Sequence, residues 1–190
     1  MIGLVPENSQ QGPSFPQTTL DLPVAQRIAQ AVEHYGEAEV IARSISLMDG
    51  KYEGEDFLLY VGGEHAQGIL NGAPVLYWPE LWGLRALQHV WSDAAISPVL
   101  DALRNPAWRV REMGCRVIAL RGLPAAEELL ALIGDGTPRV RAAAARALGA
   151  VGSPEDIEGI RTFTKDPVLE VRRSAQQGIE TLRSRFPSTR

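Results

Sequence analysis

Apolar residues recur at helical spacing through most of the chain. After Asp21, the apolar side chains of residues 23–35 return every three or four positions. Residues 37–48 and 55–70 show the same spacing, and the pair Gly62-Gly63 interrupts the second of these stretches. One face of a helix recurs with this period, whereas the faces of a strand alternate every second residue. The pattern therefore predicts an all-α chain.

The second half of the chain repeats itself every 30 or 31 residues. The three copies begin at turn residues Asn105, Asp135 and Asp166, and a shorter helix precedes each copy. Helix–turn–helix units of this length stack into an α-solenoid, because no unit can bury its apolar face alone. A degenerate copy lies upstream, where Arg85-Ala86-Leu87 precedes Arg146-Ala147-Leu148 by two repeat lengths.

The copies resemble short HEAT-like repeats of the bilin-lyase type, with their D-x-x-x-x-VR-x-x-A-x-x-AL pattern, across roughly residues 55–185. The resemblance implies a superhelix of antiparallel helix pairs whose second helices line a concave surface. Family members include scaffolds, chromophore lyase subunits and DNA alkylbase glycosylases. The last copy departs from the pattern at Gln177-Gly178, and residues 1–54 do not follow it, which leaves them unassigned.

These patterns predict three segments. Residues 1–20 are rich in Pro, Gln, Ser and Thr without a helical period, which favours an extended arm. Residues 21–54 are expected to form a helical cap, and residues 55–190 a solenoid. The expected repeat units lie near 55–92, 94–121, 124–151 and 154–185.

Acidic turn residues and helix arginines form two parallel columns along the repeats. Each turn residue precedes an arginine by six positions, so an acid of one unit can reach the arginine of its neighbour. Arginine pairs with carboxylates and carbonyls through a planar fork, so we expect this ladder to fix the repeat register. Contact with an anionic ligand is the alternative role. The ladder consists of Asn105, Arg111, Asp135, Arg141, Asp166 and Arg172.

A second set of arginines recurs beside the ladder. Residues seven apart share a helix face, so two such pairs predict an exposed basic stripe. An ordinary solvated face and a binding surface are both compatible with this spacing. The set consists of Arg85, Arg109, Arg116, Arg139, Arg146 and Arg173.

All four tryptophans lie within one short region: Trp78, Trp82, Trp91 and Trp108. Their spacing does not fit a single helix face, so some of them must be core residues. The others are candidates for a binding surface, because tryptophan and arginine together are typical of interaction hot spots.

Charge divides the chain into unequal halves. Residues 1–84 contain eleven acidic and three basic residues, whereas residues 85–190 contain twelve acidic and sixteen basic ones. An acidic cap on a repeat stack produces this asymmetry, and so does a chain with two functional halves. The formal net charge of −4 argues against a surface built entirely to coat nucleic acid or anionic lipid.

Candidate catalytic groups are few. His34, His65 and His89 lie in no metalloprotease or hydrolase motif, and Cys115 is expected to be a buried core residue. The glycines form no phosphate-binding loop. We therefore expect no catalytic residue, no metal and no cofactor. A single cysteine excludes an internal disulfide, and the first residues resemble no signal peptide, so we expect a cytoplasmic protein.

The leading hypothesis is a non-enzymatic HEAT-repeat scaffold or adaptor that binds a protein partner through a concave Arg/Trp surface. One alternative is a nucleic-acid-binding protein related to the DNA alkylbase glycosylases, acting through the basic C-terminal half. Another is a chromophore (bilin) lyase-like or chaperone subunit. The resemblance leaves all three open, because a repeat fold does not define a site. No membrane contact is expected.

Overall fold

A computed structural model describes residues 20–187 of the chain, and every regular element in that range is a helix. The all-α prediction is confirmed. The predicted arm, apart from its last residue, lies outside the described residues. The first four helices are α1 (Val24–Tyr35), α2 (Glu37–Met48), α3 (Glu55–Gly62) and α4 (Glu64–Leu70). The next is α5 (Trp78–Ala86).

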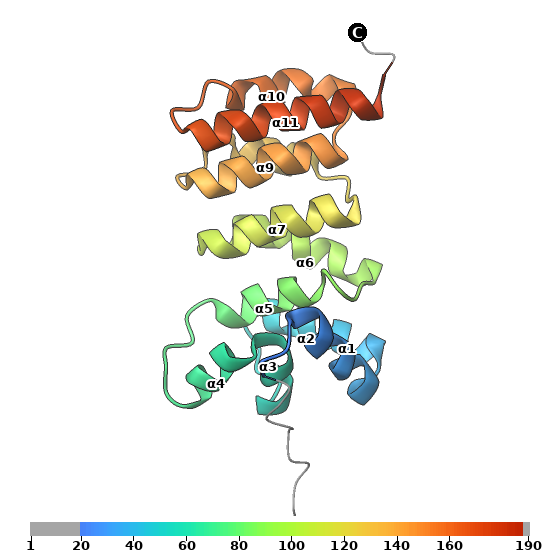
Figure 1. Cartoon of the computed structure of the whole chain (residues 1–190), viewed down its shortest axis with the longest axis vertical. Coiled ribbons are helices and arrows are strands. Elements are labelled where there is room, and N and C mark those ends of the chain that lie inside the picture. The colour runs from blue at the N-terminus through green and yellow to red at the C-terminus, as the bar shows by residue number, and fades with distance from the viewer. Residues whose placement is uncertain (1–19, 188–190) are drawn as a thin grey trace, which may run out of the picture.

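Three helix pairs follow α5. They are α6 (Ile96–Asp101) with α7 (Trp108–Arg121), α8 (Ala126–Ala131) with α9 (Pro138–Val151), and α10 (Ile157–Phe163) with α11 (Leu169–Arg185). Single 3-10 turns lie beside the shorter first helices, at Asp93–Ala95, Ala102–Arg104, Leu132–Gly134 and Pro154–Asp156. In Figure 1, α7, α9 and α11 lie parallel in one layer, with α6 and α10 behind them. This is the predicted α-solenoid. We call α5, α7, α9 and α11 the second helices.

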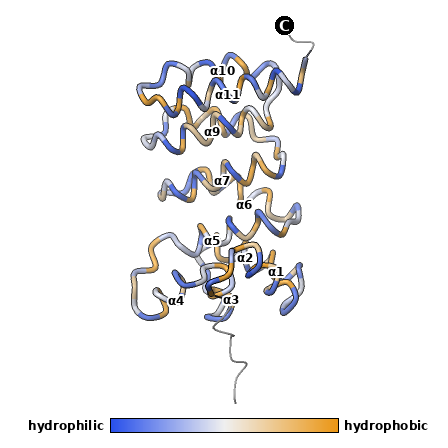
Figure 2. The backbone as a smooth tube through the Cα atoms, in the orientation of Figure 1, coloured by the Kyte–Doolittle hydropathy of each residue, from blue (hydrophilic) through white to orange (hydrophobic). Residues whose placement is uncertain are grey.

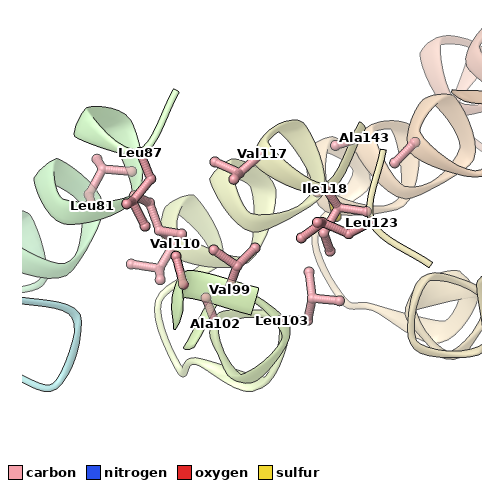
Figure 3. Close-up of a cluster of buried hydrophobic side chains, with 14 of the residues drawn as sticks. Leu81, Leu87, Val99, Ala102, Leu103, Val110, Val117, Ile118, Leu123 and Ala143 are labelled. Carbon is pink, nitrogen blue, oxygen red and sulfur yellow. The ribbon is translucent and has the colours of Figure 1, made fainter. Parts of the chain in front are cut away.

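One continuous core joins the repeats. Leu87 just after α5, Val99 on α6 and Val117 on α7 are fully buried, and the core continues through Ile118 toward Ala143 on α9. Figure 3 shows these side chains converging between the helices. Hydrophobic and hydrophilic positions alternate along α7, α9 and α11 in Figure 2, as expected for helices with one face inside the stack. Stacking therefore supplies the core that no single helix pair could form.

Glycines set the closest helix contacts. A Cβ on Gly149 of α9 would lie 2.5 Å from the Cα of Gly178 on α11, so these two backbones almost touch. Five of the eight buried residues of α9 are alanines, so most of its buried side chains are small. Gly178, which departs from the repeat pattern, is required by this close approach. A Cβ on Gly83 of α5 would likewise collide with the backbone oxygen of Ser44 on α2.

The predicted interruption at Gly62-Gly63 is confirmed, because α3 ends there and α4 begins at Glu64. Gly63 has φ +59° and ψ −142°, a backbone conformation that residues other than glycine rarely adopt. A Cβ at this position would also lie 2.8 Å from the guanidinium carbon of Arg27. The break in the helix thus makes room for a buried arginine.

Candidate binding surface

The turn acids and helix arginines of consecutive repeats meet in two-pronged ion pairs. Arg111 donates from Nε to Oδ2 of Asp135 at 2.7 Å and from Nη2 to Oδ1 at 3.0 Å. Arg141 donates to Asp166 in the same way, at 2.6 and 3.0 Å. Both pairs are largely buried. Each carboxylate also accepts a backbone N–H of its own turn, from Thr137 in the case of Asp135.

These contacts favour the charged carboxylates. The hydrogen bond from Arg141 is the main reason that the pKa of Asp166 lies below its ordinary value. Burial opposes ionisation of Asp135, but the hydrogen bonds from Arg111 and Thr137 outweigh it, and its pKa is also lowered. The ladder arginines are thus occupied inside the stack, where they hold neighbouring repeats in register.

The ladder has a defined beginning. Glu80 on α5 occupies the position that corresponds to Arg111, one repeat earlier. An aspartate at position 105 would face this carboxylate, and the chain has Asn105 there instead. Asn105 still accepts the N–H of Ala107 at 2.9 Å, so it keeps the turn without adding a negative charge. At the other end, Arg172 donates to the carbonyls of Asp166 and Pro167 within its own turn.

Two further arginines brace the opposite ends of the second helices. Arg121 of α7 donates to the carbonyls of Leu87 and Val90, just beyond α5, at 2.8 to 3.3 Å. Arg185 of α11 donates to the carbonyls of Gly149 and Gly152 at the end of α9. A cation is favourable at a helix carboxyl end, where carbonyls lack partners. These roles were missed in the sequence, because their partners lie more than thirty residues away.

An aromatic and arginine cluster lies at the amino ends of the second helices. Trp108, the first residue of α7, has the guanidinium of Arg109 4.4 Å from its ring centroid and that of Arg139 from α9 at 5.8 Å. Arg109 also donates to the Tyr77 hydroxyl at 2.7 Å. We call this surface the aromatic–arginine strip: His65, Tyr77, Trp78, Trp108, Arg109 and Arg139.

The strip continues toward α4 through ring contacts. Tyr77 and Trp78 have ring centroids 5.3 Å apart, and the His65 ring lies 3.9 Å from that of Trp78. The loop before α5 adds exposed apolar surface, since Leu76 is 69% exposed. Leu76 has φ +49°, the one positive φ at a non-glycine residue in the described range. A bulky residue in this region is strained, so the surrounding contacts must hold the loop in place.

The other predicted basic residues behave differently from one another. Arg116 is exposed but paired with Glu112 at 2.7 Å, and Arg146 donates to the hydroxyl of Ser174 on α11 at 2.6 Å. Arg85 is half-buried, and its pKa is lowered by burial and then by the nearby charge of Arg116. Arg173 is exposed on α11. The predicted stripe is therefore a set of partly satisfied positions rather than a uniform charged face.

Two tryptophans do not belong to this surface. Trp82 is only 1% exposed and packs in the core, where a Cβ on Gly62 would lie 2.9 Å from its ring. Assigning it to a binding surface was therefore wrong, because its ring lies inside the fold, whereas Trp78 in the first turn of α5 is only partly buried. Trp91 lies under the guanidinium of Arg121, at the carboxyl end of α7, whereas Trp108 begins that helix.

Trp91 instead borders a separate open apolar groove of about 570 Å³ against α2. The fourteen residues of α7 span roughly 20 Å, so Trp91 and Trp108 cannot contact one small ligand. The single tryptophan surface expected from the sequence is thus divided into a strip at Trp108 and a groove at Trp91.

Arg27 is a buried charged residue that the sequence analysis did not single out. It is 8% exposed and donates to the carbonyls of Tyr60, Leu20 and Leu22. Burial, followed by the charge of Arg85, lowers its pKa. Its donors are used for tying α1 to α3, which assigns it a structural role.

The candidate chemical groups have ordinary surroundings. Cys115 is buried in α7, and burial raises its pKa to about 12, so the thiol is not a nucleophile at neutral pH. Within residues 20–187, no three His, Cys, Asp or Glu side chains gather in an arrangement suited to a metal ion. Over the same range, no helix combines the length and the apolar character needed to cross a bilayer.

Comparison with known proteins identifies the family of this repeat stack. Residues 85–180 match the family described as HEAT repeats, which covers α5 from Arg85 through most of α11. The chain is also 37% identical over 102 residues to deoxyhypusine hydroxylase of Gallus gallus. That similarity covers 52% of this chain and 34% of the relative, so the chain spans about a third of that protein's length.

Proposed function

The chain belongs to the HEAT-repeat family, and we propose that it acts as a scaffold or adaptor that binds a protein partner through the second-helix side of the stack, at the aromatic–arginine strip. One observation carries this proposal: at the surface, the guanidinium groups of two arginines from consecutive repeats lie over the Trp108 ring, 4.4 and 5.8 Å from its centroid. Tryptophan, tyrosine and arginine are the residues most enriched in interaction hot spots. The strip contains all three.

The arginines of the stack differ in their partners, and this difference supports the proposal. Arg111 and Arg141 are held by carboxylates inside the stack, and Arg121 and Arg185 brace helix ends. Arg109 and Arg139 have no carboxylate partner in the described range and lie exposed against the Trp108 ring. Their guanidinium edges are the ones left to meet another molecule.

The proposed organisation follows from the same contacts. Helices α1 and α2 lie at the end of the stack next to α5, where α2 approaches Gly83 closely. We take residues 21–54 as a cap and the segment from residue 55 onward as the solenoid. The cap removes the exposed apolar end that a repeat stack would otherwise present to water.

Affinity capture with the full chain tests this function. Trp108→Ala should lose the captured partner, because it removes the centre of the strip. Trp91→Ala is the matched control, since it removes the same ring from the far end of α7 and should retain the partner. Circular dichroism establishes that both variants are helical. Equal recovery by the wild type and Trp108→Ala, or equal loss in both variants, would contradict the proposal.

The nucleic-acid alternative makes a different prediction. A short DNA duplex would quench tryptophan fluorescence at low salt and lose affinity steeply as salt rises, because phosphate contacts release counterions. Absence of such binding would remove this alternative and leave the scaffold function. The chromophore alternative would require binding of a tetrapyrrole, measured by its absorption spectrum.

A further inference from the structure

Arg109 and Arg139 stand where the helix backbone disfavours a positive charge. Each is the second residue of its helix, α7 or α9. The amino end of a helix carries a partial positive charge, so an arginine there lowers helix stability and an acid raises it. Neither first turn contains an acidic residue to compensate.

The third repeat has an acidic residue at this position, which stabilises the helix. Glu170 is the second residue of α11 and aligns with Arg109 and Arg139 in the repeat register. The fold therefore accepts an acid here, and the two preceding repeats have arginine for a reason other than helix stability. Residues that oppose stability in this way are typical of sites that bind a ligand.

The side chains are also held in place before any ligand arrives. Arg109 is fixed by its hydrogen bond to Tyr77 and its position over the Trp108 ring, and the guanidinium of Arg139 also lies over that ring, 5.8 Å from its centroid. Stacking uses the flat face of a guanidinium and leaves N–H donors along its edge. Two preordered forks on neighbouring helices suit two carboxylates, because each fork can bind one in a bidentate fashion.

The repeat spacing limits how those carboxylates are arranged. Packed helix axes lie about 8–10 Å apart. An extended peptide in the polyproline II conformation advances roughly 3.1 Å per residue and returns to the same face every third residue, so two side chains three residues apart match the separation of neighbouring second helices. The described residues 20–84 contain ten acidic and three basic residues, and this excess of negative charge would repel a long polyanion that ran past the strip. A short acidic protein segment fits this charge distribution better than a nucleic acid does.

We infer that the strip binds an extended acidic protein segment in which two carboxylates three residues apart pair with Arg109 and Arg139, while an intervening side chain packs on Trp108. This inference rests on the proposed scaffold function and names the chemistry of its partner.

The test measures binding of labelled synthetic peptides to the full chain by fluorescence anisotropy. One peptide has glutamate at every third position among prolines, serines and valines, which favour an extended conformation. A second has glutamine in place of each glutamate, and a third has the same composition with all glutamates contiguous. The first should bind at least about tenfold tighter than the glutamine peptide, and tighter than the contiguous one.

Charge reversal then separates binding from folding. The double variant Arg109→Glu with Arg139→Glu should bind the first peptide at least about tenfold more weakly than the wild type. Its melting temperature should be equal or higher, because an acidic residue is favourable at the amino end of a helix. Arg183→Glu makes the same change at an exposed site near the end of α11 and should leave peptide binding within about twofold. A melting temperature that falls together with binding would assign these arginines a structural role and overturn the inference.

Other outcomes are equally decisive. Equal affinity for the glutamate and glutamine peptides overturns the inference, as does tighter binding of an oligothymidylate of the same charge. If no peptide binds while the double variant still loses the partner captured by the wild type, the acidic segment is wrong and the scaffold function stands. If capture is also unchanged in the double variant and in Trp108→Ala, both proposals fail.

Discussion

Arg111 and Asp135 belong to consecutive repeats and form a parallel pair of hydrogen bonds, 2.7 Å from Nε to Oδ2 and 3.0 Å from Nη2 to Oδ1. Nη1 of the same arginine donates to the carbonyl of Asn105 at 2.7 Å, so one side chain ties a helix to its own turn and to the next unit. Because the ion pair is largely buried, its loss leaves an uncompensated charge inside the stack.

Removing this carboxylate should destabilise the fold in two separable steps. Asp135→Ala removes the ion pair and the hydrogen bond to Thr137, and we expect it to lower the free energy of unfolding by about 3 kcal/mol. Asp135→Asn keeps the turn, as Asn105 does in the preceding copy, and should cost about half as much. Urea denaturation measures both.

A control for that experiment is the exposed pair of Asp101 and Arg104, 3.5 Å apart. Asp101→Ala should change stability by less than about 0.5 kcal/mol, because exposed ion pairs contribute little. Similar losses in Asp101→Ala and Asp135→Ala would show that the ladder does not fix the repeat register.

The ladder was predictable from sequence because it depends on a spacing that recurs. The same reasoning could not separate Trp78 from Trp82, because the two lie four positions apart on α5 and the sequence of that helix shows no apolar stripe. Arg121 and Arg27 were missed for a different reason. Their partners are backbone carbonyls, which carry no sequence signal, and the stack brings those carbonyls within reach.

Acid should weaken the stack through the ladder carboxylates. The pKa values of Asp135 and Asp166 are lowered in the folded chain, so their contribution is present above the ordinary aspartate pKa of about 4 and is lost as pH falls through the lowered values. Thermal melts from neutral pH downward should show this decline. It should be shallower in the variant that combines Asp135→Asn and Asp166→Asn, and an unchanged slope would contradict the assignment.

The contact between α9 and α11 should not tolerate a methyl group. Gly149→Ala would place a Cβ 2.5 Å from the Cα of Gly178, and we expect a loss of about 2 kcal/mol or more in the free energy of unfolding. Gly68 in α4 has no atom within 4 Å of its added Cβ. Gly68→Ala should therefore stabilise the chain, by up to about 1 kcal/mol, because alanine favours helix. Chemical denaturation of the two variants distinguishes the effects.

Cys115 should be inert in the folded protein. Its thiol is buried and its pKa is raised to about 12, so almost no thiolate is present at pH 8 and the sulfur is shielded from reagents. A disulfide reagent that absorbs on reaction should modify it only as fast as the chain unfolds, and rapidly in urea. Fast modification without urea would mean that α7 opens readily.

The most direct test of the binding surface follows the four tryptophan indole N–H signals by NMR while the full chain is titrated with its captured partner. Single Trp→Phe variants assign each signal. We predict that the Trp108 signal shifts or broadens, with Trp78 following it, while Trp82 in the core and Trp91 beneath Arg121 do not change. Movement of Trp91 with an unchanged Trp108 signal would place the partner in the groove beside α2 and contradict the account.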